Sequence, residues 1–340
     1  MTSSAGGRAV STAPSPPAPA LADFFLCDIA GAIPKDDMAS MEHPVFSLST
    51  RPDRRVLSYA HKGISVEITP SVKGLATIHD KDVLIFCISQ LVAALNAGRP
   101  TARRLELVAH DLLTATGRET SGDSYRRLRE AFERLAGTRI TTNIRTGDTD
   151  TTTGFGLIEE WRIVRRTRSG RMVSVSVTLS DWLYRAVLTR SVLTLSRDYF
   201  GLRKPLERRL YELARKHCGR QPRWQVSMAV LCAKSGSASP LRVFRRMVKD
   251  IAAADPLPDY SLSVEPGDLV AVTPRVLAEP AGGPLLDAAA LEAARAAAPG
   301  WDVYALEADW RRYWAATGRP RLRSPARAFV AYCAKRASGE

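Results

Sequence analysis

The sequence of 340 residues lacks several features that mark common protein classes. Its five cysteines are scattered and form no Cys-x-x-Cys pair, which argues against a disulfide framework and a zinc module. The longest apolar run, residues 83–95, is interrupted by Ser89 and Gln90 and is shorter than the roughly 20 residues that cross a bilayer. Residues 1–20 hold no hydrophobic segment of the secretory type. These absences favour a soluble, cytoplasmic protein without a membrane partner.

Motifs of enzymes that act on nucleic acids are also missing. No G-x-x-x-x-G-K-[ST] loop occurs, which argues against a P-loop ATPase, and the five histidines never form the His-x-His pair of a metal-dependent nickase. The run from His217 to Arg220 is similar to the His-x-x-Arg box of tyrosine recombinases. It falls at the end of a predicted helix, residues 203–217, where Gly219 suits the C-cap. We therefore expect no catalytic residue, cofactor or metal.

Basic residues, by contrast, are concentrated in the middle of the chain. Residues 99–250 hold 31 Lys and Arg against 15 Asp and Glu, whereas the rest of the chain holds 18 against 20. A polyanion would exploit this segment, because each neutralised phosphate releases counterions. Nucleic acid is the expected partner, and a solvated basic surface is the alternative.

Hydrophobic periodicity predicts the same order of elements twice. A strand near residue 107, a short helix, a break at Gly117 and a second helix from Tyr125 are followed by strands at 140–144, 157–164 and 172–179. Later come a strand at 224–226, a short helix, a break at Gly236, a helix starting at Ser239-Pro240 and a hairpin within 260–272. An offset of 119 residues places the first set on the second up to the end of its second helix, without a gap, which indicates an internal duplication.

The repeated unit fits a winged helix-turn-helix, whose second helix enters the major groove. Arg can read guanine there, and Ser can contact bases or phosphates. The predicted DNA-binding residues are those of the two second helices and of the first hairpin: Ser121, Ser124, Arg126, Arg127, Arg129, Arg165, Arg166, Arg168, Ser239, Arg242, Arg245, Arg246 and Lys249. The alternative is two amphipathic helices with solvated basic faces. Two such helices in register, inside the basic segment, favour DNA binding.

Helix 203–217 has an apolar stripe with charged residues elsewhere, which predicts a packing helix between the two units. Arg208 and Arg209 could contact phosphate between two half-sites, or belong to an exposed Arg-Glu face. Residues 301–337 predict two helices separated at Gly318-Arg319-Pro320. Their aromatic residues favour a small core over the stacking of single-stranded bases or a docking site for a host protein.

Five stretches resemble the RepA-like plasmid replication initiator proteins: residues 35–44, 74–82, 154–158, 180–186 and 203–214. Together these stretches cover about residues 23–273, and a fainter resemblance lies at residues 301–335. The resemblance implies tandem winged helices that bind double-stranded DNA at repeats in a plasmid origin, open the duplex, and recruit a host helicase or initiator protein. It also allows for a homodimer that represses its own gene and so controls copy number. A transcriptional repressor without origin activity is the alternative, and a partitioning protein is a third reading.

The expected fold class is α+β, with tandem winged helix-turn-helix domains and a small helical C-terminal region. The expected boundaries are a disordered Ala/Pro/Ser tail at 1–20, a first winged-helix domain at 21–180, a second at 181–273, an Ala/Pro/Gly-rich linker at 274–300 and the helical region at 301–340.

Overall fold

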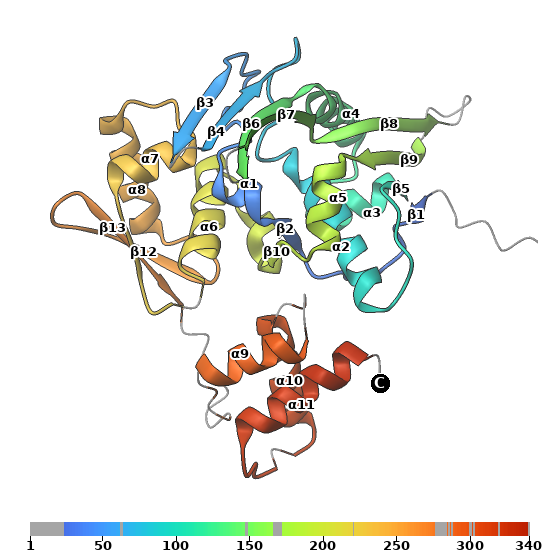
Figure 1. Ribbon diagram of the computed structural model, residues 1–340. Coiled ribbons are helices and arrows are strands. Elements are labelled where there is room, and N and C mark those ends of the chain that lie inside the picture. Colours follow the sequence, from blue (N-terminus) through green and yellow to red (C-terminus); the bar gives the residue numbers. More distant parts are fainter. Residues whose placement is uncertain are drawn as a thin grey trace, which may run out of the picture.

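The computed structural model describes residues 24–61, 64–146, 149–165, 172–219, 221–275, 284, 286, 288–298, 301, 303–318 and 320–338. The fold is mixed α+β, with three helices at the C-terminal end that lie below the main body in Figure 1. Within these residues, no helix is both long enough and apolar enough to cross a membrane. The predicted tail at 1–20 lies outside the described residues, and the predicted domain boundaries remain predictions.

The first repeated set of elements, here the first unit, is a strand, two helices and a hairpin. It comprises β5 (Arg104–Leu107), α3 (Ala109–Ala115), α4 (Gly122–Gly137), β8 (Ile158–Arg165) and β9 (Met172–Leu179). Strand β5 pairs antiparallel with β9, which pairs antiparallel with β8. The short strand β1 (Phe25–Leu26) joins the outer edge of β5 in parallel, so the sheet order is β1-β5-β9-β8.

The second unit has the same order of elements and the same pairing. It comprises β11 (Trp224–Ser227), α7 (Met228–Ser235), α8 (Leu241–Ala254), β12 (Tyr260–Glu265) and β13 (Leu269–Pro274). The first strand again pairs with the last, and the sheet order is β11-β13-β12. Two helices therefore connect the first strand to a hairpin in both units.

The 119-residue offset holds for the helix starts and the turns. Helices α3 and α7 begin 119 residues apart, as do α4 and α8. Gly117 and Gly236 both have positive φ, +65° and +71°. The buried faces differ, however, because α8 buries Phe244, Val248 and Ile251, which match buried Leu128, Phe132 and Leu135 of α4 at an offset of 116. A shift of three residues turns a helix by about 60° from full register, so the outward faces of α4 and α8 are not equivalent.

A four-stranded sheet adjoins the first unit: two of its strands precede the unit in the chain, and two are inserted between α4 and β8. Its strands are β3 (Leu57–His61), β4 (Ile64–Thr69), β6 (Arg139–Thr146) and β7 (Thr149–Gly156), in the order β3-β4-β6-β7. The strand predicted at 140–144 belongs to this sheet and not to the hairpin of the repeated unit. The sequence reading missed β3, β4 and β7. In β7 the cause is composition, since its sequence TDTTTGFG has a single large apolar residue.

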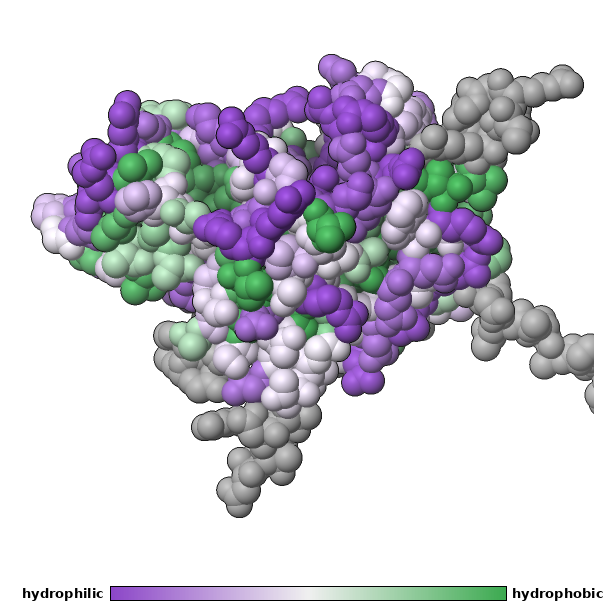
Figure 2. All heavy atoms as spheres, turned by 90° about the horizontal axis from the view of Figure 1, so that it is seen from above, coloured by the Kyte–Doolittle hydropathy of each residue, from purple (hydrophilic) through white to green (hydrophobic). Residues whose placement is uncertain are grey.

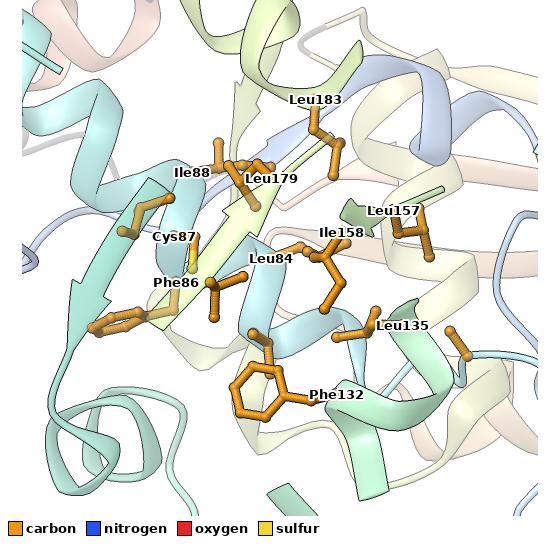
Figure 3. Close-up of a cluster of buried hydrophobic side chains, with 14 of the residues drawn as sticks. Leu84, Phe86, Cys87, Ile88, Phe132, Leu135, Leu157, Ile158, Leu179 and Leu183 are labelled. Carbon is orange, nitrogen blue, oxygen red and sulfur yellow. The ribbon is translucent and has the colours of Figure 1, made fainter. Parts of the chain in front are cut away.

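Helix α2 (Lys81–Asn96) lies in the core of the first unit. Its sequence is apolar on nearly all sides, which is typical of a buried helix. Figure 3 shows Leu84 and Ile88 of α2 among Phe132 of α4, Ile158 of β8 and Leu179 of β9. The apolar run at residues 83–95 lies within this helix, which begins two residues earlier, at Lys81.

Helix α6 (Pro205–His217) belongs to a second core that reaches into both units. This core contains Met41, Ile85 of α2, Leu210 of α6 and Phe244 of α8. Helix α1 (Met38–Glu42) and the 3-10 helix η1 (Arg197–Gly201) contribute Met41 and Tyr199 to this core. Helix α5 (Asp181–Leu188) packs instead against α2 and β2 (Lys35–Asp37), and β10 is Val192–Thr194. Strand β2 pairs antiparallel with β10. The second unit is therefore joined to the first through shared apolar packing.

Three helices form the C-terminal group: α9 (Ala288–Ala297), α10 (Val303–Ala316) and α11 (Pro325–Ser338). They share a small core in which Trp310 of α10 lies 5.4 Å from Phe329 of α11 between ring centroids. Trp314 is also buried, whereas Tyr313 is 58% exposed. The aromatic residues of this region therefore serve mainly as core, as the helical spacing indicated.

Candidate nucleic-acid interface

Helix α4 carries the first group of predicted DNA-contacting residues. Ser121 is its N-cap, and its side-chain oxygen accepts a hydrogen bond from the backbone N–H of Ser124. Arg126, Arg127 and Arg129 are exposed and lie off the buried stripe. The structure therefore leaves this group of arginines accessible to a ligand.

Each of these three arginines already has an acidic partner on the same helix. Arg126 and Arg127 both pair with Asp123, and Arg129 pairs with Glu133 at 3.1 Å. Such pairs one turn apart contribute little when water surrounds them. They nevertheless reduce the charge of the helix, since α4 holds four arginines against three acidic residues. Its field is therefore weakly positive.

Helix α8 is more basic and has fewer internal partners. It holds four basic residues against one acidic residue. Arg242 is exposed and has no hydrogen bond or ion pair with any described residue. Arg246 is exposed, and its closest carboxylate is that of Asp250 at 3.9 Å. The helix starts at Leu241 with Pro240 as its N-cap, so Ser239, where the sequence predicted the start, lies one residue before the N-cap.

Arg245 has a structural contact that the sequence did not reveal. Its guanidinium donates two hydrogen bonds to Asp268, at 2.7 and 2.8 Å. Asp268 lies in the turn between β12 and β13, and its backbone oxygen accepts a hydrogen bond from the N–H of Met228. The hydrogen bonds from Arg245, together with the charge of nearby Lys249, hold the pKa of Asp268 below its ordinary value. Arg245 therefore fixes the second hairpin against α8.

The first hairpin carries the other predicted basic residues. Arg165 ends β8 and is paired in register with Met172, the first residue of β9. Arg166 and Arg168 lie outside the described residues. In the sequence, all three stand at the turn of this hairpin, so their contact with the DNA backbone stays a prediction.

The turn between α7 and α8 lies close to the first unit. Gly236 has a φ of +71°, and a Cβ there would lie 2.7 Å from the side chain of Pro44. The hydroxyl oxygen of Tyr59, on β3, would lie 3.1 Å from the same Cβ. Glycine is required at this turn both for the positive φ and for the close approach. Pro44 and β3, which precede the first unit in the chain, thus help to position the start of α8.

Arg208 and Arg209 are buried, so both predictions for them, phosphate contact and an exposed Arg-Glu face, are wrong. Their exposed fractions are 3% and 2%. Arg208 donates to Asp82 at 2.6 Å, and the same carboxylate accepts a hydrogen bond from Arg118 at 2.8 Å. The charged side of α6 therefore faces other charged groups inside the protein.

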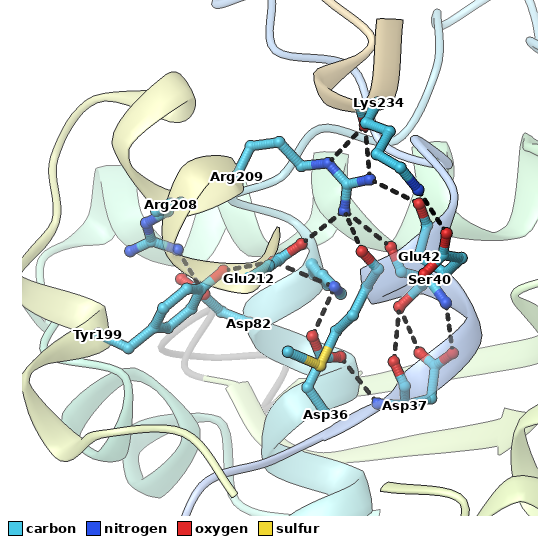
Figure 4. Close-up of polar contacts among 12 residues, drawn as sticks. Asp36, Asp37, Ser40, Glu42, Asp82, Tyr199, Arg208, Arg209, Glu212 and Lys234 are labelled. Atoms are coloured by element: carbon cyan, nitrogen blue, oxygen red, sulfur yellow. Dashed lines mark hydrogen bonds and ion pairs between the residues drawn. The ribbon is translucent and has the colours of Figure 1, made fainter. Parts of the chain in front are cut away.

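These arginines belong to a buried network of charged residues at the junction of the two units (Figure 4). Lys81 of α2 lies 2.6 Å from a carboxylate oxygen of Asp36 and 3.1 Å from one of Glu212. Burial acts to lower the pKa of Lys81, but these two carboxylates outweigh it and hold the pKa above its ordinary value. Glu212 also accepts a hydrogen bond from the Tyr199 hydroxyl at 2.8 Å. Burial raises the pKa of the Asp36 carboxyl well above its ordinary value, although Lys81 opposes the shift. The basic side chains of the junction therefore lie against buried acidic groups.

His217 is part of the protein's interior packing. Its ring stacks on Trp224 with centroids 4.8 Å apart, and its Nε2 lies 3.2 Å from Glu42. Burial lowers the pKa of His217 to about 4, although Glu42 opposes the shift. The helix ends at His217 with Cys218, and not Gly219, as the C-cap.

Figure 2 looks from above onto the upper side of the molecule in Figure 1, where α4 and the β3–β4 hairpin lie. Hydrophilic residues predominate on it, with apolar residues in smaller groups. Among the described residues, no cluster of three or more His, Cys, Asp or Glu could hold a metal ion.

The chain is similar to known replication proteins. The family model of replication initiator protein A matches residues 35–262. A relative from Wigglesworthia glossinidia brevipalpis, described as "Putative replication protein", is 36% identical over 244 residues, which is 71% of this chain and 88% of the relative. The crystal structure of domains 2 and 3 of RctB is similar with a TM-score of 0.51 at 14% identity, over 68% of this chain and 94% of that one.

The mixed α+β fold is thus shared with domains 2 and 3 of RctB. The chain belongs to the replication initiator protein A family. The family resemblance expected from the sequence is confirmed.

Proposed function

We propose that this chain is a sequence-specific DNA-binding protein that initiates plasmid replication by binding repeats at its origin. Each unit would act as a winged helix-turn-helix, with α4 or α8 in the major groove and the hairpin beside the backbone. The observation that carries the proposal is the repeated order of strand, two helices and hairpin, with the first strand paired to the last in both units. The second helix of each unit, α4 or α8, also carries more basic than acidic residues.

Helix α8 is the better candidate for reading bases. Arg242 and Arg246 are exposed and have weak or no internal ion pairs, so little must be broken before they contact DNA. The arginines of α4 share their helix with three acidic residues, which leave its field only weakly positive. We therefore propose that α8 supplies the larger share of specificity and α4 a weaker second contact.

Membership of the family supports the further steps of the proposal. After binding, the protein would open the neighbouring duplex and recruit a host helicase or initiator protein, and it could repress its own gene as a homodimer. It would act through binding, with no catalytic step of its own. Its residues would then serve recognition and assembly.

Binding to the DNA that flanks the coding region tests the first part. We expect repeats in this DNA to bind the protein at fixed salt concentration, with competitor DNA of unrelated sequence present. Arg246→Ala should weaken binding, whereas Arg185→Ala should not. Arg185 is a matched control because it is an exposed arginine one turn from its partner Asp181, on α5. Equal binding to the unrelated sequence would contradict the proposal.

Plasmid maintenance separates an initiator from a repressor. Deletion of the gene should abolish replication of the plasmid, and the protein supplied in trans should restore it. A repressor without origin activity would bind the same DNA but leave maintenance unchanged after deletion.

A further inference from the structure

One buried guanidinium links the ends of two helices that belong to different parts of the fold. Arg209 of α6 donates to the backbone oxygens of Ser40 and Met41, both at 3.0 Å, and to that of Glu42 at 3.3 Å. It also donates to the backbone oxygen of Lys234, at 2.8 and 3.2 Å. The first three oxygens lie in α1 and the fourth in the last turn of α7, as Figure 4 shows.

These carbonyls need partners from outside their own helices. The last four backbone oxygens of a helix have no partner within it, and they carry the negative end of the helix dipole. A planar guanidinium supplies several donors in fixed directions, which the ammonium group of lysine cannot match. Glu212 accepts a further hydrogen bond from Arg209 at 3.1 Å, which balances the buried charge. Arg209 thus satisfies the ends of α1 and α7 together.

The two helices lead to different DNA-binding units. Helix α1 follows directly on β2, which packs against α2 in the core of the first unit. Helix α7 leads through the Gly236 turn into α8. At the rim of the same contact, Lys234 pairs with Glu42 at 2.6 Å. The position of α8 relative to the first unit therefore depends on this contact.

We propose that Arg209 is a positioning residue that fixes α8 relative to α4 and so sets the half-site spacing that the protein accepts on DNA. This inference rests on the proposed function. One inserted base pair increases the separation of two half-sites by about 3.4 Å and rotates one relative to the other by about 34°. A rigid junction cannot adjust α4 and α8 to both the new separation and the new rotation. The affinity gained by binding two linked half-sites at once is then lost.

The test compares single half-sites with paired half-sites whose separation is changed by one or two base pairs. For the wild-type chain, we expect the wrong spacing to lower affinity by about 100-fold. Arg209→Lys should keep the affinity for single half-sites but reduce the loss of affinity at the wrong spacing to below about tenfold. Lysine keeps the positive charge but cannot donate to all the backbone oxygens that the planar guanidinium binds. Arg203→Lys, at an exposed position just before α6, is the matched control and should behave as wild type.

A second pair of variants tests the same contact at its partly exposed rim. Lys234→Glu places two carboxylates together and should also reduce the spacing penalty, and the exchanged pair Lys234→Glu with Glu42→Lys should restore it. This rescue keeps the inference testable if Arg209→Lys does not fold. An unchanged spacing penalty in Lys234→Glu and in folded Arg209→Lys would overturn the inference while leaving the proposed function intact. Failure of the wild-type chain to bind any half-site would overturn both.

Discussion

Replacing Asp82 with Asn should destabilise the protein strongly. The Asp82 carboxylate is 1% exposed and lies 2.6 Å from Arg208 and 2.8 Å from Arg118. Asn keeps the shape and removes the charge, so the buried guanidinium of Arg208 loses its counterion. Removing one partner of a buried pair costs about 3–5 kcal/mol. A domain of 150–250 residues changes its Tm by about 2–4 °C per kcal/mol, which gives a fall of about 6–20 °C.

Calorimetry and urea unfolding would measure the effect of this variant. Asp181→Asn is the control, because Asp181 also pairs with an arginine but on the surface of α5. Its Tm should stay close to that of the wild type, since water already screens an exposed pair. A free energy of unfolding for Asp82→Asn within about 1 kcal/mol of the wild type would refute the view that buried charge pairing holds the junction together.

Three further outcomes are expected. Because burial holds the pKa of His217 at about 4 in the folded state, below about 6.5 when unfolded, the contribution of His217 to stability should be complete above pH 6.5 and be lost as the pH drops toward 4. Burial lowers the pKa of His79 to about 4 as well, so His79 should add to the same decline. His217→Gln should flatten this decline in urea unfolding, and an equally steep decline would contradict the assignment. In DNA titrations, Arg246→Ala should cost about 1–3 kcal/mol of binding free energy and Arg127→Ala less, with near-additive losses when combined; the reverse order would contradict the role given to α8. The salt dependence of DNA binding should weaken when Arg165, Arg166 and Arg168 are replaced with Gln. The slope of the logarithm of the binding constant against the logarithm of the salt concentration should fall by up to about three units, while sequence preference is kept. An unchanged slope would contradict the assignment of the first hairpin to the interface.

The repeated order of elements was predictable because its signals are local. Apolar spacing in α4 and the break at Gly117 are visible in a short window of sequence. The pairing of the first strand with the last is not local, because it depends on contacts between residues that are about 70 apart, as for Leu107 and Val175. The inserted β7 was missed for a different reason, namely that its threonines and glycines have no apolar alternation.

The junction could not be predicted from residue type. Charged residues such as Arg208 and Arg209 are normally exposed, and their burial depends on partners from distant segments. The partner of Arg208 is Asp82, 126 residues away, and that of Lys81 is Asp36. The sequence signal was the family resemblance at 35–44, 74–82 and 203–214. These three stretches supply most of the residues of the network in Figure 4.

The residues predicted to bind DNA fall into separate groups in the structure. Arg242 and Arg246 are exposed on α8 as expected, whereas Arg245 binds Asp268 within the second unit. The spacing of apolar residues in α8 predicts which side of the helix faces outward. It does not show that Asp268, in the turn between β12 and β13, accepts hydrogen bonds from Arg245. Contacts of that kind depend on how the hairpin folds back.

Footprinting on origin DNA tests the central claim most directly, because it resolves the two units separately. We expect each bound protein to protect two major-groove segments about one helical turn apart, which is about 10 base pairs. Arg246→Ala should weaken protection of one segment, and Arg127→Ala should weaken protection of the other. Protection of a single segment, or of random positions along the DNA, would contradict the claim that two linked units read the origin.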